Sequence, residues 1–284
     1  MTTREVWEVY RKECSDDILF WNRQRLAHEH LKELDGIAIE SLKPSVIREA
    51  LKGLSKYSSS TLRRDLQALN AAINTCRKLG LITHQPYIPM PKESAPRKQF
   101  ATWEQMRMIL DGADHYDQWL KTMTMLLCYT GQRMGIIMRL TWGEIDLQNQ
   151  TIWYSAKRNG RQKGALDVAM HAELYTYLWN LRQQLGYPPD NRLVVSDEHG
   201  RRPGSPNYWW RKLLASVGLD KSFSPHIMRH SVATNLVREG VPLIKVSKLL
   251  GHSSTAITER VYAKFSPGYT REAVDAIRPH SSSN

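Results

Sequence analysis

The chain has 284 residues, of which 41% are hydrophobic, and its formal net charge is +12. This length suits about two domains, and this share of apolar residues excludes a mainly disordered chain. No apolar run reaches the roughly 20 residues that a membrane span needs, so we expect no membrane partner. The excess of Lys and Arg favours a polyanionic partner such as nucleic acid. Three scattered cysteines and a polar N-terminus predict a cytoplasmic protein without disulfides or a signal peptide.

The first part of the chain, residues 1–91, reads as a helical domain. In VWEVYRKECSDDILFW the apolar residues return every three or four positions, as one buried helix face requires. A second helix is predicted over STLRRDLQALNAAINTCRKLG, with Ser60 or Thr61 as its N-cap and Gly80 at its end. Its opposite face is basic, and two interpretations stay open: a solvated surface, or contact with phosphates.

The periodicity stops at a proline-rich stretch, HQPYIPMPKESAPRKQF. We interpret residues 92–100 as a linker and residues 101–284 as a second domain. This domain begins with a predicted helix capped by Thr102 and Gln105, followed by an apolar helix that ends at Gly131. TIWYSA, LDVAM and RLVVS are predicted strands, and KRNGRQKG is a hairpin turn between the first two. The predicted fold is therefore mainly α with a small antiparallel β-sheet (α+β).

Near the C-terminus, several helix ends bring reactive side chains within reach of one another. Ser224 and Pro225 predict the start of a helix that runs toward Gly240. In that helix, His226 and Arg229 share one face. The next helix, PLIKVSKLL, ends at Gly251 and leaves His252 just beyond it, and a third helix from Ser254 or Thr255 carries Tyr262.

These segments resemble the sequence boxes of the tyrosine recombinases, the family of the phage integrases and the Xer recombinases. TGQRMGIIMRLTWGEIDL is similar to the first box, with its arginine at Arg133. HIMRH is similar to the second box, with His226 and Arg229, and LLGHSS followed by Tyr262 is similar to the third, with His252. SAKRNG is similar to the lysine-bearing turn of the family, which points to Lys157.

The resemblance implies an enzyme that cleaves and rejoins DNA at specific sites through a 3′-phosphotyrosine, without a cofactor or a metal ion. It implies a core-binding domain in residues 1–91 and a catalytic domain in residues 101–284, which includes an exchange segment at Tyr269–Ile277. The implied partners are double-stranded DNA and an accessory protein that bends DNA. The implied assembly is a homotetramer on two DNA sites. The implied location is the cytoplasm, in association with the nucleoid.

Each residue type suits one demand of this chemistry. Tyr262 supplies a phenol that can hold phosphate covalently. Arg133 and Arg229 supply permanent positive charge for the oxygens of the transition state. A general acid must protonate the leaving 5′-oxygen, and Lys157 has that role by resemblance, with Lys163 on the same turn as the alternative. The resemblance gives His226 a role in proton transfer near the tyrosine and His252 a hydrogen bond to a non-bridging oxygen.

The chain departs from the family pattern at two places. Ile136 stands three residues after Arg133, where the family usually has an acidic residue, and Ile227 and Met228 replace an acidic residue and a leucine in the second box. These departures favour a mobile-element integrase over a housekeeping Xer recombinase that resolves chromosomes or plasmids. A type IB topoisomerase and a catalytically silent DNA-binding relative stay open as alternatives. His226 and His230 have metal-ligand spacing, but no Glu follows His226 as in zinc-protease helices.

Overall fold

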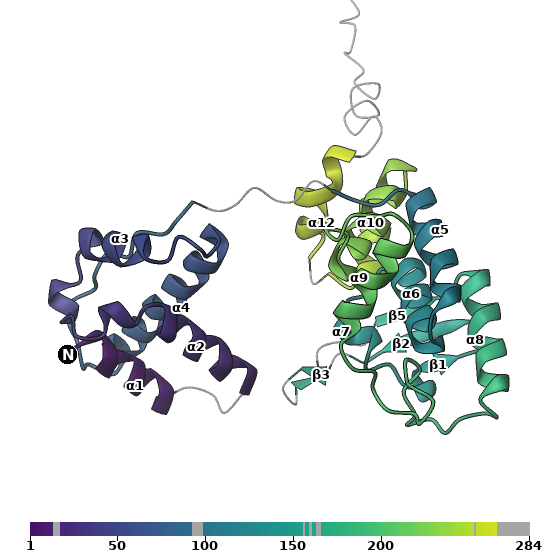
Figure 1. Cartoon of the computed structure of the whole chain (residues 1–284), viewed down its shortest axis with the longest axis horizontal. Coiled ribbons are helices and arrows are strands. Elements are labelled where there is room, and N and C mark those ends of the chain that lie inside the picture. Colours follow the sequence, from purple (N-terminus) through teal and green to yellow (C-terminus); the bar gives the residue numbers. More distant parts are fainter. Residues whose placement is uncertain are drawn as a thin grey trace, which may run out of the picture. The chain divides into compact units, whose positions relative to one another are not determined.

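The computed structural model describes residues 1–13, 18–92, 99–155, 157–158, 161–162, 166–252 and 254–265. The chain divides into two compact units, Met1–Arg97 and Lys98–Asn284, each of which is described by itself (Figure 1). The proposed linker 92–100 lies largely outside the described ranges, and the proposed exchange segment Tyr269–Ile277 lies entirely outside them. Within those ranges, no helix has the length and apolar character to cross a membrane.

Unit 1 is helical and has its own apolar core, in which α1 and α2 both pack on the long helix α4. The N-cap of α4 is Ser58, whose side chain accepts a hydrogen bond from the Thr61 amide at 3.2 Å, so the predicted caps Ser60 and Thr61 were wrong. Ser58 has extended backbone angles, which an N-cap needs, whereas its successors are already helical. The helices of this unit are α1 (Thr3–Glu13), α2 (Ile18–His30), η1 (Lys32–Leu34), η2 (Ile39–Ser41), α3 (Pro44–Lys52) and α4 (Ser59–Lys78).

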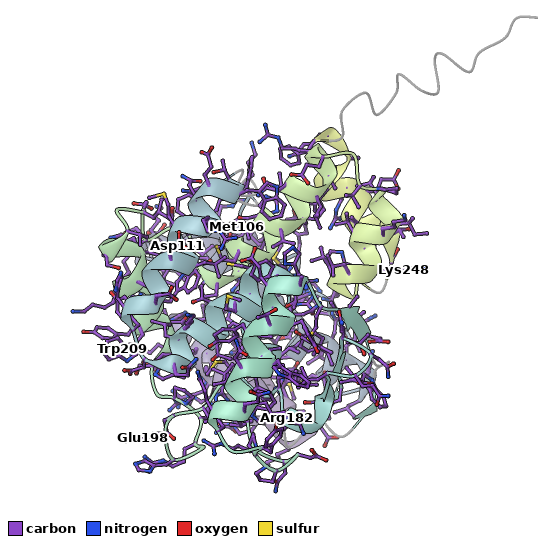
Figure 2. The ribbon with its side chains drawn as sticks, turned by 90° about the vertical axis from the view of Figure 1, so that its right-hand side faces the viewer. Met106, Asp111, Arg182, Glu198, Trp209 and Lys248 are labelled. Carbon is purple, nitrogen blue, oxygen red and sulfur yellow. The ribbon has the colours of Figure 1, made fainter. Side chains whose placement is uncertain are left out.

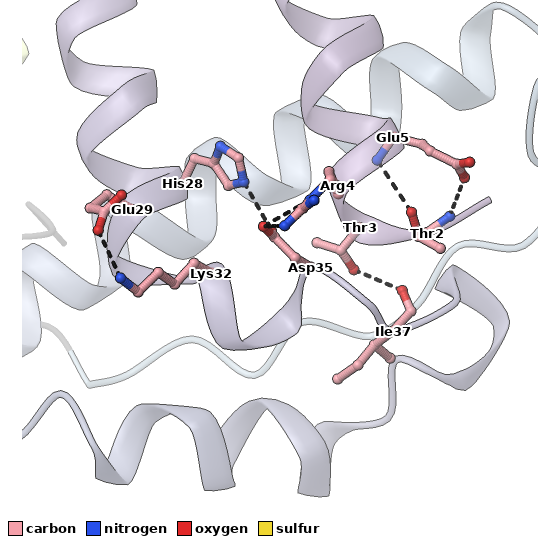
Figure 3. A network of polar contacts seen from close by, with 9 residues as sticks. All are labelled: Thr2, Thr3, Arg4, Glu5, His28, Glu29, Lys32, Asp35 and Ile37. Atoms are coloured by element: carbon pink, nitrogen blue, oxygen red, sulfur yellow. Dashed lines mark hydrogen bonds and ion pairs between the residues drawn. The ribbon is translucent and has the colours of Figure 1, made fainter.

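Polar contacts fix the N-terminus of unit 1 to the turn that follows α2 (Figure 3). The carboxylate of Asp35 accepts from the Arg4 guanidinium at 3.3 Å and lies 2.9 Å from Nε2 of His28. Thr3 donates its hydroxyl hydrogen to the carbonyl of Ile37 at 3.1 Å. These contacts hold the start of α1 against a segment more than 30 residues away in sequence.

Unit 2 encloses a larger core, formed by helices on both sides of the apolar helix α6. As predicted, Thr102 and Gln105 form a capping box at the start of α5, and Gly131 ends α6 in the left-handed conformation. An ion pair of 2.9 Å between Arg107 and Glu173 joins α5 to α8, the two helices at the front of Figure 2. The helices are α5 (Trp103–Gly112), η3 (Ala113–His115), α6 (Gln118–Thr130), α7 (Met134–Ile137), η4 (Trp142–Glu144), α8 (Ala172–Gln184), α9 (Pro206–Ser216), α10 (Pro225–Arg238), α11 (Leu243–Leu250), α12 (Thr255–Tyr262) and η5 (Ala263–Phe265).

The strands of unit 2 form two small antiparallel sheets. One has the order β1-β2-β5, and the other pairs β3 with β4 and extends from the body of the unit (Figure 1). The predicted fold class, mainly α with a small antiparallel sheet, is confirmed. The strands are β1 (Ile145–Asp146), β2 (Thr151–Tyr154), β3 (Lys157–Arg158), β4 (Arg161–Gln162) and β5 (Leu166–Ala169).

The strand predicted over RLVVS was wrong. Within this segment only Leu193 forms an isolated β-bridge, to Thr141. Beside it, the Val194 amide donates a hydrogen bond to the Leu140 carbonyl, and the Trp142 amide donates one to the Arg192 carbonyl. Val194 and Val195 are buried, so the apolar pattern reflects a loop that packs into the core and not a paired strand. A short apolar run does not by itself distinguish these two cases.

Candidate active site

The centre of the candidate site is Arg229, a buried arginine on α10 that is only 3% exposed. Its guanidinium donates to the carbonyl of Gly131 at 3.1 Å and to that of Leu250 at 2.7 Å. Both carbonyls lie at the C-terminal ends of helices, α6 and α11, where backbone oxygens lack helical partners and carry partial negative charge. Two helix ends therefore hold the arginine and balance the cost of burying its charge.

The same hydrogen bonds hold the first predicted box, which contains Arg133, against the second, which contains Arg229. Gly131 takes the left-handed backbone, and its carbonyl accepts from Arg229. Gln132 is buried and donates to the carbonyl of Leu249 at 2.7 Å, which adds a second link between this turn and α11. Arg133 follows as the N-cap of α7, with an exposed side chain. The turn thus presents Arg133 to solvent beside the buried Arg229.

The third predicted box, which contains His252, lies near Arg229 through the turn after α11. Gly251 ends α11 in the left-handed conformation, as predicted, and His252 follows it. Nδ1 of His252 lies 2.7 Å from the hydroxyl oxygen of Thr258, a fully buried residue of α12. This contact fixes the ring and leaves Nε2 as the nitrogen that can meet a phosphate oxygen.

Tyr262 closes the site from α12, where it is 6% exposed and packs against apolar residues of α10 and α11. The ring of His230 lies beside it, with 5.2 Å between the ring centroids. Burial raises the pKa of the Tyr262 phenol, and the positive charge of Arg229 acts in the opposite direction. The phenol is therefore not sealed in a purely apolar interior, because the central arginine lies within electrostatic range of it.

The electrostatics of the site are those of a cluster with surplus positive charge. Burial and the neighbouring charge of Arg133 lower the pKa of Arg229 to about 10, so it stays charged at neutral pH. Burial and the charges of Arg229 and Arg133 lower the pKa of His252 to about 4, and the same causes lower that of His226. Two arginines and two neutral histidines are a suitable set of donors for an anionic group.

We expect this charge cluster to make folding stability depend on pH. In the folded protein His252 resists protonation, whereas an unfolded histidine takes up a proton near its ordinary pKa of 6.5. The unfolded chain thus binds more protons between that value and about 4, so stability should fall as the pH falls through this window. Urea unfolding at pH about 7.5 and about 5 should show a smaller loss in His252→Gln than in the parent protein.

His115 on η3 offers the matched control, because it is an exposed histidine elsewhere in unit 2. His115→Gln should lose as much stability on acidification as the parent protein. An equal loss in His252→Gln would contradict the assignment of the pH response to this site.

The lysine hairpin is described only in part. The backbone of Lys157 lies in β3, paired with Gln162 of β4, and Lys163 lies outside the described residues. At the far end of the hairpin, Leu166 packs so close to Gly251 that a Cβ there would come within 2.9 Å of its Cδ2. Gly251 precedes His252, so one end of the hairpin borders the site.

The structure brings the predicted residues Arg133, Arg229 and His252 together near Tyr262, and it shows further contacts that the sequence did not predict. Gln132, Thr258 and His230 were missed as contacts of the site. Each lies within six residues of a predicted site residue, so proximity in sequence was a usable signal. Ile136 packs against the apolar core and Ile227 and Met228 are buried in it, so these departures from the family pattern serve packing. In the part of the chain that the structure describes, no three His, Cys, Asp or Glu side chains form a group that could hold a metal ion.

Comparison with known sequences gives one consistent result. Residues 99–267 match the model of the Phage integrase family. The chain is 26% identical over 286 residues to the tyrosine recombinase XerC of Pseudomonas fluorescens, which covers 98% of this chain and 91% of that protein. It is 27% identical over 197 residues to the tyrosine recombinase XerD of Halalkalibacterium halodurans, a match that covers 64% of this chain and 66% of XerD. An integrase of Streptomyces ambofaciens is 24% identical over 292 residues, or 91% of this chain and 74% of that protein.

Solved structures share the fold. The Tn1549 transposon integrase, in a complex with transposon right end DNA, superposes with a TM-score of 0.80 at 19% identity and covers 97% of this chain and 99% of that one. A lambda integrase dimer bound to a COC′ core site gives a TM-score of 0.73 at 16% identity, over 100% of this chain and 81% of that one. A lambda integrase tetramer bound to a Holliday junction gives 0.70 at 17% identity, over 89% and 76%.

Proposed function

This chain belongs to the phage integrase family and is a tyrosine recombinase, and we propose that it cleaves and rejoins DNA through a bond between Tyr262 and a 3′-phosphate. The observation that carries the proposal is the pair of contacts made by Arg229. Its bonds to Gly131 and Leu250 bring the turn of Arg133 and the turn of His252 to one point, next to Tyr262.

In the proposed reaction, the phenolic oxygen of Tyr262 attacks phosphorus while the bond from phosphorus to the 5′-oxygen breaks. Burial raises the pKa of this phenol, so its proton must leave during the attack and not before it. His226 has a lowered pKa and is a neutral acceptor near Arg229, which suits it to assist that transfer. The phosphate ester of tyrosine keeps the energy of the broken bond, so a free 5′-hydroxyl can reverse the step on another strand without ATP.

Positive charge at the site would stabilise the oxygens of the five-coordinate phosphorus. A guanidinium has five N–H donors, so Arg229 keeps donors for phosphate after it has met two carbonyls. Arg133 would add a second guanidinium and His252 a neutral donor at Nε2. Donors that are fixed before the substrate arrives need no reorganisation during the reaction.

Lys157 is proposed to give a proton to the departing 5′-oxygen. If it is the acid, Lys157→Ala should cleave an ordinary phosphodiester about 10²–10⁴-fold more slowly, which is the usual contribution of general acid catalysis. A substrate with sulfur in place of that 5′-oxygen should restore the rate, because a thiolate leaves without a proton. Lys163→Ala is the matched control, and rescue of that variant alone would move the role to Lys163.

The proposal extends to the assembly and to its location. We propose a homotetramer that joins two double-stranded DNA sites. In each subunit, residues 101–284 form the catalytic domain and residues 1–91 form a second domain that binds DNA. The lambda integrase tetramer on a Holliday junction supports this assembly by its similar fold. An accessory protein that bends DNA and association with the nucleoid in the cytoplasm are parts of the same proposal. The integrase of a mobile element is the favoured role, and Xer-type resolution is the second candidate because of the similarity to XerC.

Capture of the covalent adduct tests the proposed function and identifies its DNA. Nicked duplexes made from fragments of the source genome would be incubated with the full chain, and protein-linked DNA would be recovered under denaturing conditions. The expected product is DNA joined to protein through its 3′-phosphate at one recurring sequence. The absence of an adduct from the whole pool would reject the proposal. Relaxation of supercoiled DNA that lacks this sequence would point to a type IB topoisomerase instead.

A further inference from the structure

A single carboxylate connects the body of unit 2 to the root of the lysine hairpin. Glu144 ends the short helix η4, and its two oxygens serve different segments. Oε2 accepts from the amide and the hydroxyl of Thr141, at 2.9 and 3.1 Å. Oε1 accepts from the amide and the hydroxyl of Ser155, at 3.2 and 2.6 Å. The first pair caps the turn of Glu144 itself, whereas the second reaches across 11 residues to the end of β2.

The Ser155 contacts lie where the two sheets of the unit separate. β2 ends at Tyr154 and is paired with β1 and β5, whereas β3 begins at Lys157 and pairs with β4 alone. Ser155 follows β2 directly, so the direction in which the chain leaves this sheet depends on what holds Ser155. The far root of the hairpin is held by the packing of Leu166 against Gly251. Glu144 holds the near root.

From this arrangement we propose that Glu144 is a positioning residue for the general acid: through Ser155 it fixes the root of β3, the strand that carries Lys157. This inference rests on the proposed function. A carboxylate suits the task because it has two acceptor oxygens and therefore serves four donors at once. Hydrogen bonds to an ionised acceptor are also stronger than those between neutral groups. A small displacement of an acid from its substrate atom costs rate steeply, since proton transfer needs hydrogen-bond distance.

Each oxygen of the Glu144 carboxylate accepts from a different residue, so substitutions at those two residues test its two sets of contacts separately. Ser155→Ala removes the 2.6 Å bond to the hairpin root and leaves the cap of η4 intact. Thr141→Val removes the 3.1 Å bond on the other oxygen, together with the capping bond that the Thr141 hydroxyl accepts from the Glu144 amide, and leaves the hairpin contacts intact. Glu144→Gln replaces one acceptor oxygen with a donor and weakens both sets. A role in folding alone would make the Ser155 and Thr141 variants alike.

The experiment compares two forms of the duplex recovered by adduct capture, one with oxygen and one with sulfur at the scissile 5′ position. With oxygen, Ser155→Ala and Glu144→Gln should form the adduct about 10–100-fold more slowly than the parent protein, as part of the general-acid contribution is lost. With sulfur, both should come within about twofold of the parent, because no acid is needed. Thr141→Val should match the parent on both substrates.

If Ser155→Ala and Glu144→Gln formed the adduct equally slowly on both substrates, the inference would be overturned, because the lost rate would then not depend on protonation of the leaving group. An unchanged rate on the oxygen substrate would overturn it as well. Rescue by sulfur of Lys163→Ala, but not of Lys157→Ala, would also overturn the inference, because Lys157 would then not be the acid that Glu144 positions. Failure of the parent protein to form any adduct in the capture experiment would reject the proposed function itself.

Discussion

Tyr262→Phe is expected to abolish the covalent adduct and to leave DNA affinity within about twofold of the parent protein. The substitution removes only the hydroxyl oxygen, which is the atom proposed to join phosphorus. The ring remains, so its packing in the apolar cluster of α10, α11 and α12 and its contact with His230 should persist. The measurement is the fraction of nicked duplex that becomes linked to protein, alongside a gel-shift titration of the same duplex.

Tyr175→Phe on α8 is the matched control, because it removes a phenolic hydroxyl from the same unit at a ring that packs beside Trp179. It should form the adduct at the parent rate. A residual adduct in Tyr262→Phe would assign the nucleophile to another side chain. Loss of DNA binding together with the adduct would show that the hydroxyl supports the structure of the site and does not act only as a nucleophile.

The sequence predicted the helix ends around the site because each depends on a local signal. Ser224 caps α10, and Gly131 and Gly251 end α6 and α11 in the left-handed conformation, as their residue types and positions indicated. Such signals involve a few neighbouring residues, so tertiary contacts rarely override them. The position of Ser58 shows the limit, because serines at three consecutive positions, 58–60, offered the same cap and only the backbone selected one.

The bonds that assemble the site could not be predicted in this way. Arg229 meets Gly131 across 98 residues, and Glu144 meets Ser155 through a turn and a strand whose geometry sets the distance. In a sequence, a carboxylate near a turn indicates only a helix cap, and Glu144 does form a capping box with Thr141. Its second oxygen acquires a partner only when β2 has paired beside it. Roles that depend on such partners appear only in three dimensions.

Arg229→Lys is expected to slow adduct formation on the order of 10²–10³-fold, the usual cost of removing one donor aimed at transition-state charge. Lysine keeps the positive charge but has one nitrogen, which cannot reach Gly131, Leu250 and a phosphate oxygen as the planar guanidinium can. The variant should also lose about 1.5–3 kcal/mol of stability, because a charge-assisted hydrogen bond to a buried carbonyl is broken. Single-turnover adduct formation and urea unfolding measure the two effects.

Arg133→Lys separates catalysis from stability, since Arg133 is the exposed N-cap of α7 while Arg229 is 3% exposed. It should slow adduct formation by a comparable factor and leave the free energy of unfolding nearly unchanged. The two arginines would then have the same role toward phosphate and different roles in the fold. If Arg229→Lys were unstable but formed the adduct at the parent rate, Arg229 would only hold α6 and α11 together. The proposed catalytic centre would then lack its central group, because the contacts with Gly131 and Leu250 would have a purely structural purpose.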